Sequence, residues 1–320
     1  MRSGKPSFPV LSPDLQVAFY YILDGLRNEC LGEALRDSVR RLQVADIDRE
    51  LRQFVPADSL RKVASFGLRG EIVFPLPLLL AASPALLGYY RLLYGLSQKE
   101  FYNKGPFGRF KRLEEGGGNT SRTAQHLEAL CVSLIGTAVQ LVEGLDDLSL
   151  PIVHDLQLLT LGPQLRGGQN TRIGQEATNA VFGLIQDIAG PSLKEATKRT
   201  LVIANKAGRT VLVEFGSDPD IRITEKLRSV VRPVVSVEIK GGADASNVHN
   251  RLGEAEKSHQ KAKNRGFFEF WTILRVQVDE AAARRESPTT SHFFQLDAIL
   301  QRRGSEHRQF RDLLCACLGI

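Results

Sequence analysis

Apolar residues recur at helical spacing through most of the first half of the chain. Between Asp14 and Cys30 they stand three or four positions apart, which is the period of one face of a helix. The same period predicts helices over Asp14–Cys30, Glu33–Leu51, Ser59–Gly67, Pro84–Leu96, Ser121–Glu143 and Arg172–Ala189. Thr120 or Ser121 would cap the fifth helix. The segment Pro151–Gly168 contains two prolines and a Gly-Gly pair, so we predict a connector there.

The second half of the chain changes to the two-residue period of strands. Val235, Val237 and Ile239 alternate with Ser236, Glu238 and Lys240, so the two sets face opposite sides of a strand. Similar runs predict strands at Thr200–Ala204, Thr210–Phe215, Ile221–Thr224, Pro233–Lys240 and Phe267–Val276. A polar helix, Ser246–Arg265, would separate the last two strands. Two further helices are predicted at His292–Gln301 and Glu306–Leu318.

This change of period divides the chain into two parts. A chain of 320 residues is long enough for two domains with cores of their own. The sequence Leu165-Arg-Gly-Gly provides a natural boundary. We therefore predict an α/β protein with a mostly helical N-terminal region, 1–165, and a second region, 166–320, in which a mixed sheet is flanked by helices.

Composition narrows the class of partner and the compartment. The net charge of +6 gives a modest preference for a polyanion. The four cysteines lack the Cys-x-x-Cys spacing of a zinc site and indicate reduced thiols in a cytoplasmic protein. The most apolar run, Leu76–Leu87, is too short to cross a bilayer, and the N-terminus lacks the apolar core of a signal peptide. We expect no membrane partner.

The strongest chemical signal is Pro219-Asp220 followed eighteen positions later by Glu238-Ile239-Lys240. On one strand, Glu238 and Lys240 lie on the same face, roughly 6.5 Å apart. If Asp220 begins the neighbouring strand, its carboxylate meets Glu238 across the ladder. Two carboxylates beside an ammonium group suit Mg²⁺. Asp218 is an alternative to Asp220, and Glu-x-Lys alone also occurs at solvated strand edges.

The order strand, strand with Pro-Asp, strand with Glu-x-Lys, helix, strand is that of a PD-(D/E)xK nuclease core. Two stretches resemble the Xcy-type family of type II restriction endonucleases within that superfamily: EIKGGADASNVHNRLGEAEKSHQKAK (Glu238–Lys263) and FPLPLLLAASPALLGYYRLLYGLSQKEFY (Phe74–Tyr102). The resemblance spans most of the chain and implies that region 166–320 is the nuclease core.

The resemblance assigns catalytic roles to Asp220, Glu238 and Lys240, with Mg²⁺ held by Asp220, Glu238 and the Ile239 carbonyl. Glu176 could add a further acidic ligand, although a solvent-facing Glu would look the same. The implied reaction is cleavage of duplex DNA at a short, GC-rich, CCCGGG-like palindrome that leaves 5′-phosphate ends. The implied setting is a homodimer in the prokaryotic cytosol, working beside a cognate DNA methyltransferase.

Two stretches could contact the DNA. The helix Ser246–Arg265 carries on its polar side residue types that read base edges. These candidates are Asn247, Asn250, Arg251, Glu254 and Lys261. Lys111 and Arg112, in a basic and aromatic segment with nearby glycines, suit phosphate contacts.

A solvated helix face or loop would carry the same residues, so other functions stay open. A less specific repair or junction nuclease and a non-catalytic DNA-binding protein are the two alternative functions.

Overall fold

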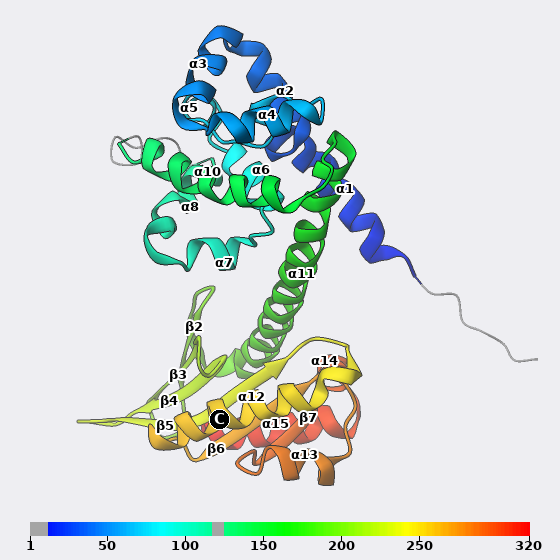
Figure 1. Ribbon diagram of the computed structural model, residues 1–320. Helices are drawn as coiled ribbons and strands as arrows, with labels where there is room; N and C mark the ends of the chain where they lie inside the picture. The colour runs from blue at the N-terminus through cyan, green and yellow to red at the C-terminus, as the bar shows by residue number, and fades with distance from the viewer. Residues whose placement is uncertain (1–11, 117–124) are drawn as a thin grey trace, which may run out of the picture. The chain divides into compact units, whose positions relative to one another are not determined.

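The computed structural model describes residues 12–116 and 125–320, and the chain forms two compact units, Met1–Gly167 and Gly168–Ile320 (Figure 1). The first unit is helical and the second contains a seven-stranded mixed sheet. The predicted α/β class with a helical N-terminal half is confirmed. The predicted caps Thr120 and Ser121 lie outside the described residues.

The described helices of the first unit are mostly short. They are α1 (Asp14–Cys30), α2 (Gly32–Arg41), α3 (Val44–Phe54), α4 (Ala57–Ser65), α5 (Pro77–Ala82), α6 (Leu86–Leu93), α7 (Gln98–Tyr102), α8 (Lys111–Glu114) and α10 (Leu127–Gly144), with 3-10 turns at Gly70–Ile72 and Gly105–Phe110. The single helix predicted over Glu33–Leu51 is wrong, because extended backbone at Leu42 separates α2 from α3. On one continuous helix Leu35 and Ile47 would point about 120° apart. The break lets both enter the core.

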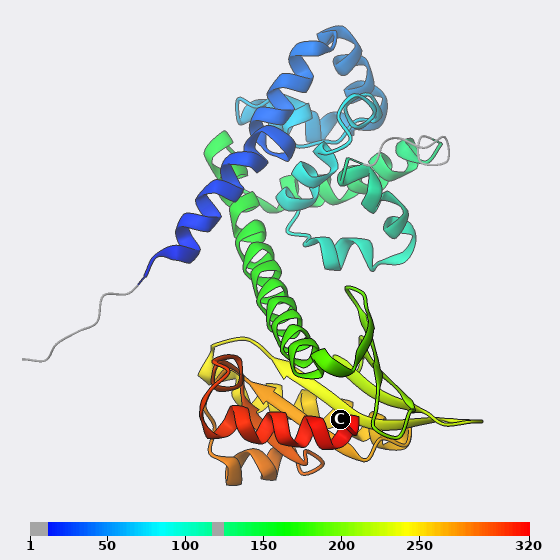
Figure 2. The same cartoon turned by 180° about the vertical axis from the view of Figure 1, so that it is seen from behind.

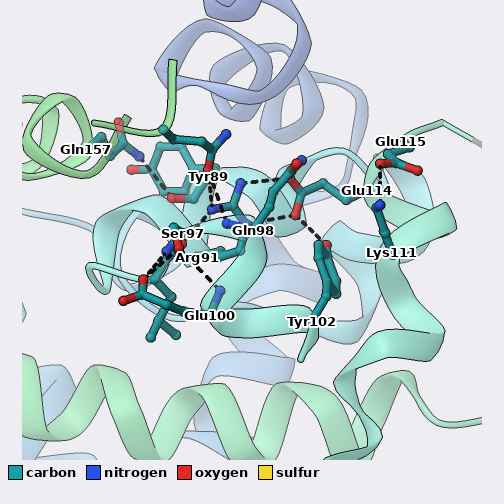
Figure 3. Close-up of polar contacts among 12 residues, drawn as sticks. Tyr89, Arg91, Ser97, Gln98, Glu100, Tyr102, Lys111, Glu114, Glu115 and Gln157 are labelled. Atoms are coloured by element: carbon teal, nitrogen blue, oxygen red, sulfur yellow. Dashed lines mark hydrogen bonds and ion pairs between the residues drawn. The ribbon is translucent and has the colours of Figure 1, made fainter. Parts of the chain in front are cut away.

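A buried ion pair joins α6 to α8. The Arg91 guanidinium, 1% exposed, donates to Glu114 at 2.8 and 3.0 Å (Figure 3). Glu114 also accepts hydrogen bonds from Tyr102 Oη at 2.5 Å and from Gln98 Nε2 at 3.0 Å. This network packs the basic and aromatic segment 97–113 into short helices and a 3-10 turn. Its aromatic residues Phe101 and Phe110 are buried.

Among the described residues, one helix is long and apolar enough to cross a bilayer by length and composition. This is α10, with a mean hydropathy of 1.4. Leu130, Leu134 and Val142 of α10 are buried in the core of the first unit. The apolar character of α10 therefore serves the core.

Helix α11 (Leu150–Ala189) runs through the segment predicted as a connector, so that prediction is wrong. Pro151 stands in the first turn, where a missing N–H removes no helical hydrogen bond. Val153, Gln157 and Leu161 follow at four-residue spacing and are buried. Burial of this stripe outweighs the helix-breaking tendency of Pro163, Gly167 and Gly168.

The sheet of the second unit has the strand order β1-β2-β3-β4-β5-β6-β7. The strands are β1 (Leu193–Ala196), β2 (Thr200–Ala204), β3 (Thr210–Phe215), β4 (Ile221–Lys226), β5 (Val231–Lys240), β6 (Glu269–Leu274) and β7 (His292–Gln295). Pairing is antiparallel from β1 to β5 and parallel from β5 to β7. The helices between and after them are α12 (Val248–Asn264), α13 (Glu280–Glu286), α14 (Leu296–Leu300) and α15 (Gly304–Leu318), with 3-10 turns at Gly190–Ser192 and Ala245–Asn247.

The predicted helix His292–Gln301 is wrong in its first half, which is β7. Phe294 packs edge-on against Trp271 in the core, and β7 pairs with β6. Tertiary pairing with an existing strand overrides the local pattern here.

Helices cover both faces of the sheet. On one face, α15 and the C-terminal part of α11 cover the sheet (Figure 2). Their apolar side chains share a single core with Val235 and Val237 of β5. On the other face α12 hydrogen-bonds to Ser236 and Glu238 of β5. The predicted alternation along this strand is therefore present, and it directs the even-numbered polar side chains toward α12.

Candidate active site

Asp220 and Glu238 lie side by side on neighbouring strands. Ile221 at the start of β4 pairs with Val237 of β5, which places Asp220 next to Glu238. The Oδ2 atom of Asp220 accepts a hydrogen bond from the Ile239 backbone N–H at 2.8 Å. Antiparallel pairing therefore brings together two carboxylates that are eighteen positions apart in the sequence.

Lys240 completes this group from the same strand. Its Nζ lies 3.1 Å from Glu238 Oε2 and 3.8 Å from Glu254 Oε2 of α12. The Lys240 side chain is 18% exposed, so the ammonium group stands at the edge of the site with access to solvent.

Helix α12 and its C-cap reach the site with Ser258 and Arg265, which the sequence alone did not identify, and with Lys261, which was predicted to contact DNA. Ser258 Oγ contacts Asp218 Oδ1 at 2.5 Å and also Glu238 Oε1. Lys261 Nζ contacts Asp218 Oδ2 at 2.7 Å, and Arg265 Nη1 donates to the Asp218 backbone carbonyl at 2.8 Å. The hydrogen bond from Lys261, together with that from Ser258, lowers the pKa of Asp218 below its ordinary value.

These contacts separate the two candidate aspartates. Both carboxylate oxygens of Asp218 are engaged by α12. Asp220 uses one oxygen for the Ile239 N–H, and its side chain lines a cavity. Asp220 is therefore the better placed of the two to hold a metal ion.

The electrostatics of Asp220 and Glu238 fit a divalent cation. Burial raises the pKa of Asp220, and burial together with the nearby Asp220 charge raises the pKa of Glu238. Across residues 12–116 and 125–320, no group of three or more His, Cys, Asp or Glu side chains is arranged as a metal site. Two carboxylates are nevertheless a donor set that Mg²⁺ uses, because it keeps several water ligands. The residues present therefore fit Mg²⁺.

The cavity beside Asp220 has a volume of about 540 Å³. Its walls come from α11, the β1–β2 turn and the ends of β3 and β5. The lining residues are Thr171, Gly174, Gln175, Thr178, Asn179, Lys198, Arg199, Phe215, Gly216, Asp220 and Ile239.

Gln175 lines this cavity, whereas Glu176, the possible additional acidic ligand, does not. The Glu176 side chain is 64% exposed and lies 3.4 Å from Arg172 on the same helix. Helical spacing alone could not decide between these neighbours, because the packing of α11 on the sheet sets which face turns inward. The position of Gly241 reflects that packing, since a Cβ there would lie 2.4 Å from Ala177 Cβ.

The predicted DNA-contacting residues of α12 and of the turn before it differ in their surroundings. Glu254 contacts Lys240 and Lys261 contacts Asp218, so both join the cluster of charged side chains around Glu238. Asn247 and Asn250 are exposed and hydrogen-bond to each other at 2.8 Å.

Arg251 occupies an intermediate position. Its Nη1 donates to the Gly242 carbonyl at 2.5 Å, and a Cβ at Gly242 would collide with the guanidinium. In the first unit, Lys111 is exposed on α8 and lies 3.7 Å from Glu115 (Figure 3). Arg112, the next residue, is also exposed.

A buried polar chain lies under the site. His259 of α12 is fully buried and contacts Ser236 Oγ at 3.3 Å and Thr272 Oγ1 at 2.9 Å. Burial lowers its pKa from 6.5 to about 4, so the ring is neutral at neutral pH. These contacts fix the register of α12 on β5 and β6, and therefore the positions of Ser258 and Lys261.

The chain is similar to known restriction enzymes over nearly its whole length. The family model described as XcyI restriction endonuclease matches residues 20–320. The chain is 43% identical to the type II restriction enzyme XcyI of Xanthomonas campestris pv. cyanopsidis, over 99% of this chain and 97% of that protein. It is 40% identical to the type II restriction enzyme Cfr9I of Citrobacter freundii, over 99% and 98% of the two chains.

No solved structure matches the chain. The family model and both relatives match nearly the whole length of the chain. The predicted resemblance is therefore confirmed. The chain belongs to the XcyI restriction endonuclease family and is a type II restriction enzyme.

Proposed function

We propose that the chain hydrolyses phosphodiester bonds of duplex DNA in a Mg²⁺-dependent reaction, with Asp220, Glu238 and Lys240 as the catalytic residues. The observation that carries the proposal is the convergence of the Asp220 and Glu238 carboxylates with the Lys240 ammonium at one end of β4 and β5. In this proposal region 166–320 is a PD-(D/E)xK core. The target is a short GC-rich palindrome of the CCCGGG type, cut to leave 5′-phosphate ends.

Asp220, Glu238 and the Ile239 carbonyl would hold the Mg²⁺ ion. When bound, Mg²⁺ supplies Lewis acidity that makes a water molecule a better nucleophile and neutralises charge on the scissile phosphate. The hydrogen bond from Ile239 N–H orients the Asp220 carboxylate. Ser258 donates to one carboxylate oxygen of Glu238, and Lys240 donates to the other.

Lys240 has the separate role of a cation at the reacting phosphate. Its ammonium is held between Glu238 and Glu254, which directs it toward the site. There it orients the attacking water and stabilises the negative charge that develops on the phosphorus oxygens.

Sequence reading is assigned to Asn247, Asn250 and Arg251, and phosphate contact to Lys111 and Arg112. Arg251 fits a GC-rich target best, because Arg makes bidentate hydrogen bonds to guanine edges, worth about 1–3 kcal/mol each. Arg251→Ala should therefore weaken binding to the cognate duplex only. Changing Lys111 and Arg112 to Ala should weaken binding to all duplexes and lower the salt dependence.

Digestion of a plasmid library with Mg²⁺ tests the main proposal. Discrete fragments whose ends all fall in CCCGGG are expected, whereas a smear would indicate a nuclease without sequence specificity. If no Mg²⁺-dependent cleavage occurs with any DNA, the catalytic assignment is wrong. Sequencing of the fragment ends gives the cut position and identifies the phosphorylated end.

The cellular setting follows from the same proposal. A palindromic target is matched by a two-fold symmetric homodimer, in which each copy cuts one strand. The enzyme would act in the prokaryotic cytosol, and a cognate DNA methyltransferase would protect the host target. Analytical ultracentrifugation with and without duplex DNA tests the dimer.

A further inference from the structure

Two cationic side chains line the cavity that contains Asp220. Lys198 and Arg199 stand in the turn between β1 and β2, and both are exposed. No sequence pattern pointed to them, because they belong to no motif and are separated from Asp220 by two strands. Their position in the cavity is set by the sheet.

The turn that carries them is held by its own hydrogen bonds. Thr197 Oγ1 accepts from the backbone N–H groups of Arg199 at 3.2 Å and Thr200 at 3.0 Å. The Arg199 carbonyl accepts from Phe215 N at 3.0 Å, which ties the turn to β3. The backbone of both cations is therefore fixed relative to the catalytic strands.

Lys198 and Arg199 have no carboxylate partner within the described parts of the chain. Nearby arginines of the same sheet do have one: Arg209 lies 2.5 Å from Glu225, and Arg222 lies 3.1 Å from Glu214. The two cavity cations are therefore available for an anion from outside the protein. Gln175, Thr178 and Asn179 of α11 add polar groups to the same wall.

We propose that Lys198 and Arg199 bind the phosphate next to the scissile phosphate on the same DNA strand. This inference rests on the proposed function, because it places the scissile phosphate at Asp220. One cavity then offers an acidic, metal-binding side for the reacting group and a cationic side for its neighbour. Charge-assisted hydrogen bonds from ammonium and guanidinium groups to phosphate oxygens hold the strand in register.

Duplex binding in EDTA tests this contact independently of metal and cleavage. The probe is a short synthetic duplex containing CCCGGG, titrated at 50 and 200 mM salt. The double variant Lys198→Ala/Arg199→Ala should bind about 10-fold or more weakly at the lower salt concentration, as expected for charged hydrogen bonds. Raising the salt concentration from 50 to 200 mM weakens binding of both proteins. Because the double variant has lost two phosphate contacts, the factor by which its affinity falls should be about 12-fold smaller than for the unchanged protein.

The control removes the same charge elsewhere in the same unit. Arg308 and Arg311 are exposed on α15 and do not line the cavity. Arg308→Ala/Arg311→Ala should change affinity less than about 2-fold and leave the salt dependence nearly unaltered. Equal effects of the two double variants would show general electrostatic attraction and would overturn the proposal.

Single methylphosphonate replacements in the duplex locate the contact. With the unchanged protein, neutralising the phosphate beside the cut should weaken binding by about the same factor as the double variant. With Lys198→Ala/Arg199→Ala, the same replacement should have no further effect. Additive losses at every position would overturn the proposal, while Mg²⁺-dependent cleavage by the unchanged protein would still support the proposed function.

Discussion

The Asp220 carboxylate accepts a hydrogen bond from the Ile239 backbone N–H at 2.8 Å. This contact joins the residue before β4 to the C-terminal end of β5, and it holds Asp220 beside Glu238. The side chain thus has a structural contact and a proposed metal-binding role. Substitutions that preserve the hydrogen bond while removing the charge can separate these roles.

Asp220→Asn, Glu238→Gln and Lys240→Ala should each reduce DNA cleavage at least about 10³-fold, comparable to the loss of one group that stabilises the transition state. The amide of Asp220→Asn can still accept from Ile239 N–H, so the fold should survive. Steady-state cleavage of a plasmid with one CCCGGG site measures the loss, and circular dichroism checks the fold.

Asp218→Asn is the matched control for Asp220→Asn. It removes a carboxylate that is bound to Lys261 and Ser258 rather than one placed for the metal. We expect a smaller loss than for Asp220→Asn. Loss of activity in Asp218→Asn with full activity in Asp220→Asn would reverse the assignment of the metal ligand.

Ca²⁺ should support specific DNA binding without cleavage, whereas Mg²⁺ should support both. Ca²⁺ accepts the same oxygen ligands but at longer distances and with more flexible geometry, so it fills the site without aligning the reaction. Gel-shift and cleavage assays on the same duplex, with each ion and with EDTA, check this. Rapid cleavage in EDTA would contradict a metal-dependent mechanism.

Glu238→Gln should stabilise the metal-free protein at neutral pH. Because the pKa of Glu238 is raised, the folded state binds more protons than the unfolded state as pH rises above the ordinary carboxyl value. Stability contributed by this group therefore falls as pH rises through that window. We expect the melting temperature in EDTA at pH 7.5 to rise by at least about 2 °C.

The same variant should lose its response to Ca²⁺. Differential scanning fluorimetry should show that Ca²⁺ stabilises the unchanged protein at pH 7.5 and leaves Glu238→Gln unaffected. A lower melting temperature for Glu238→Gln in EDTA would mean that the ion pair with Lys240 outweighs the burial of the carboxylate.

His259 should make stability fall on the acid side of neutrality. Its folded pKa of about 4 lies below the ordinary value of 6.5, so the unfolded state binds a proton first as pH falls. Its contribution is complete above about pH 6.5 and is lost toward pH 4, by about 3 kcal/mol at most. His259→Gln keeps two hydrogen-bonding groups and should flatten this slope in urea unfolding measured between pH 4 and 7. Parallel slopes for the two proteins would contradict this.

Glu114→Ala should destabilise the first unit by about 3–5 kcal/mol, because it leaves the buried Arg91 guanidinium without its charge partner. Glu115→Ala is the control one residue away. Its pair with Lys111 is exposed at 3.7 Å and should be worth less than about 1 kcal/mol. Urea unfolding followed by far-ultraviolet circular dichroism compares them, and equal losses would show that the Arg91 pair is not important for stability.

The sequence by itself determined the strand that carries Glu238 and Lys240 and the face on which they lie. The two-residue period of Val235, Val237 and Ile239 puts Glu238 and Lys240 on the opposite face, since strand geometry allows no other arrangement. The order of elements from β2 to β6 also followed from local patterns and turn residues. The full-length family relationship was visible in two stretches of sequence.

Only the tertiary structure decided which distant side chains share the site. Ser258 and Lys261 reach Asp218 from about forty positions away, because α12 packs on the face that bears Glu238. Gln175 faces the cavity instead of Glu176 because the rotation of α11 is fixed by its packing on the sheet. Local periodicity indicates which residues of an element are buried, but not which other element packs against them. Contacts between distant elements therefore appear only when the whole chain is folded.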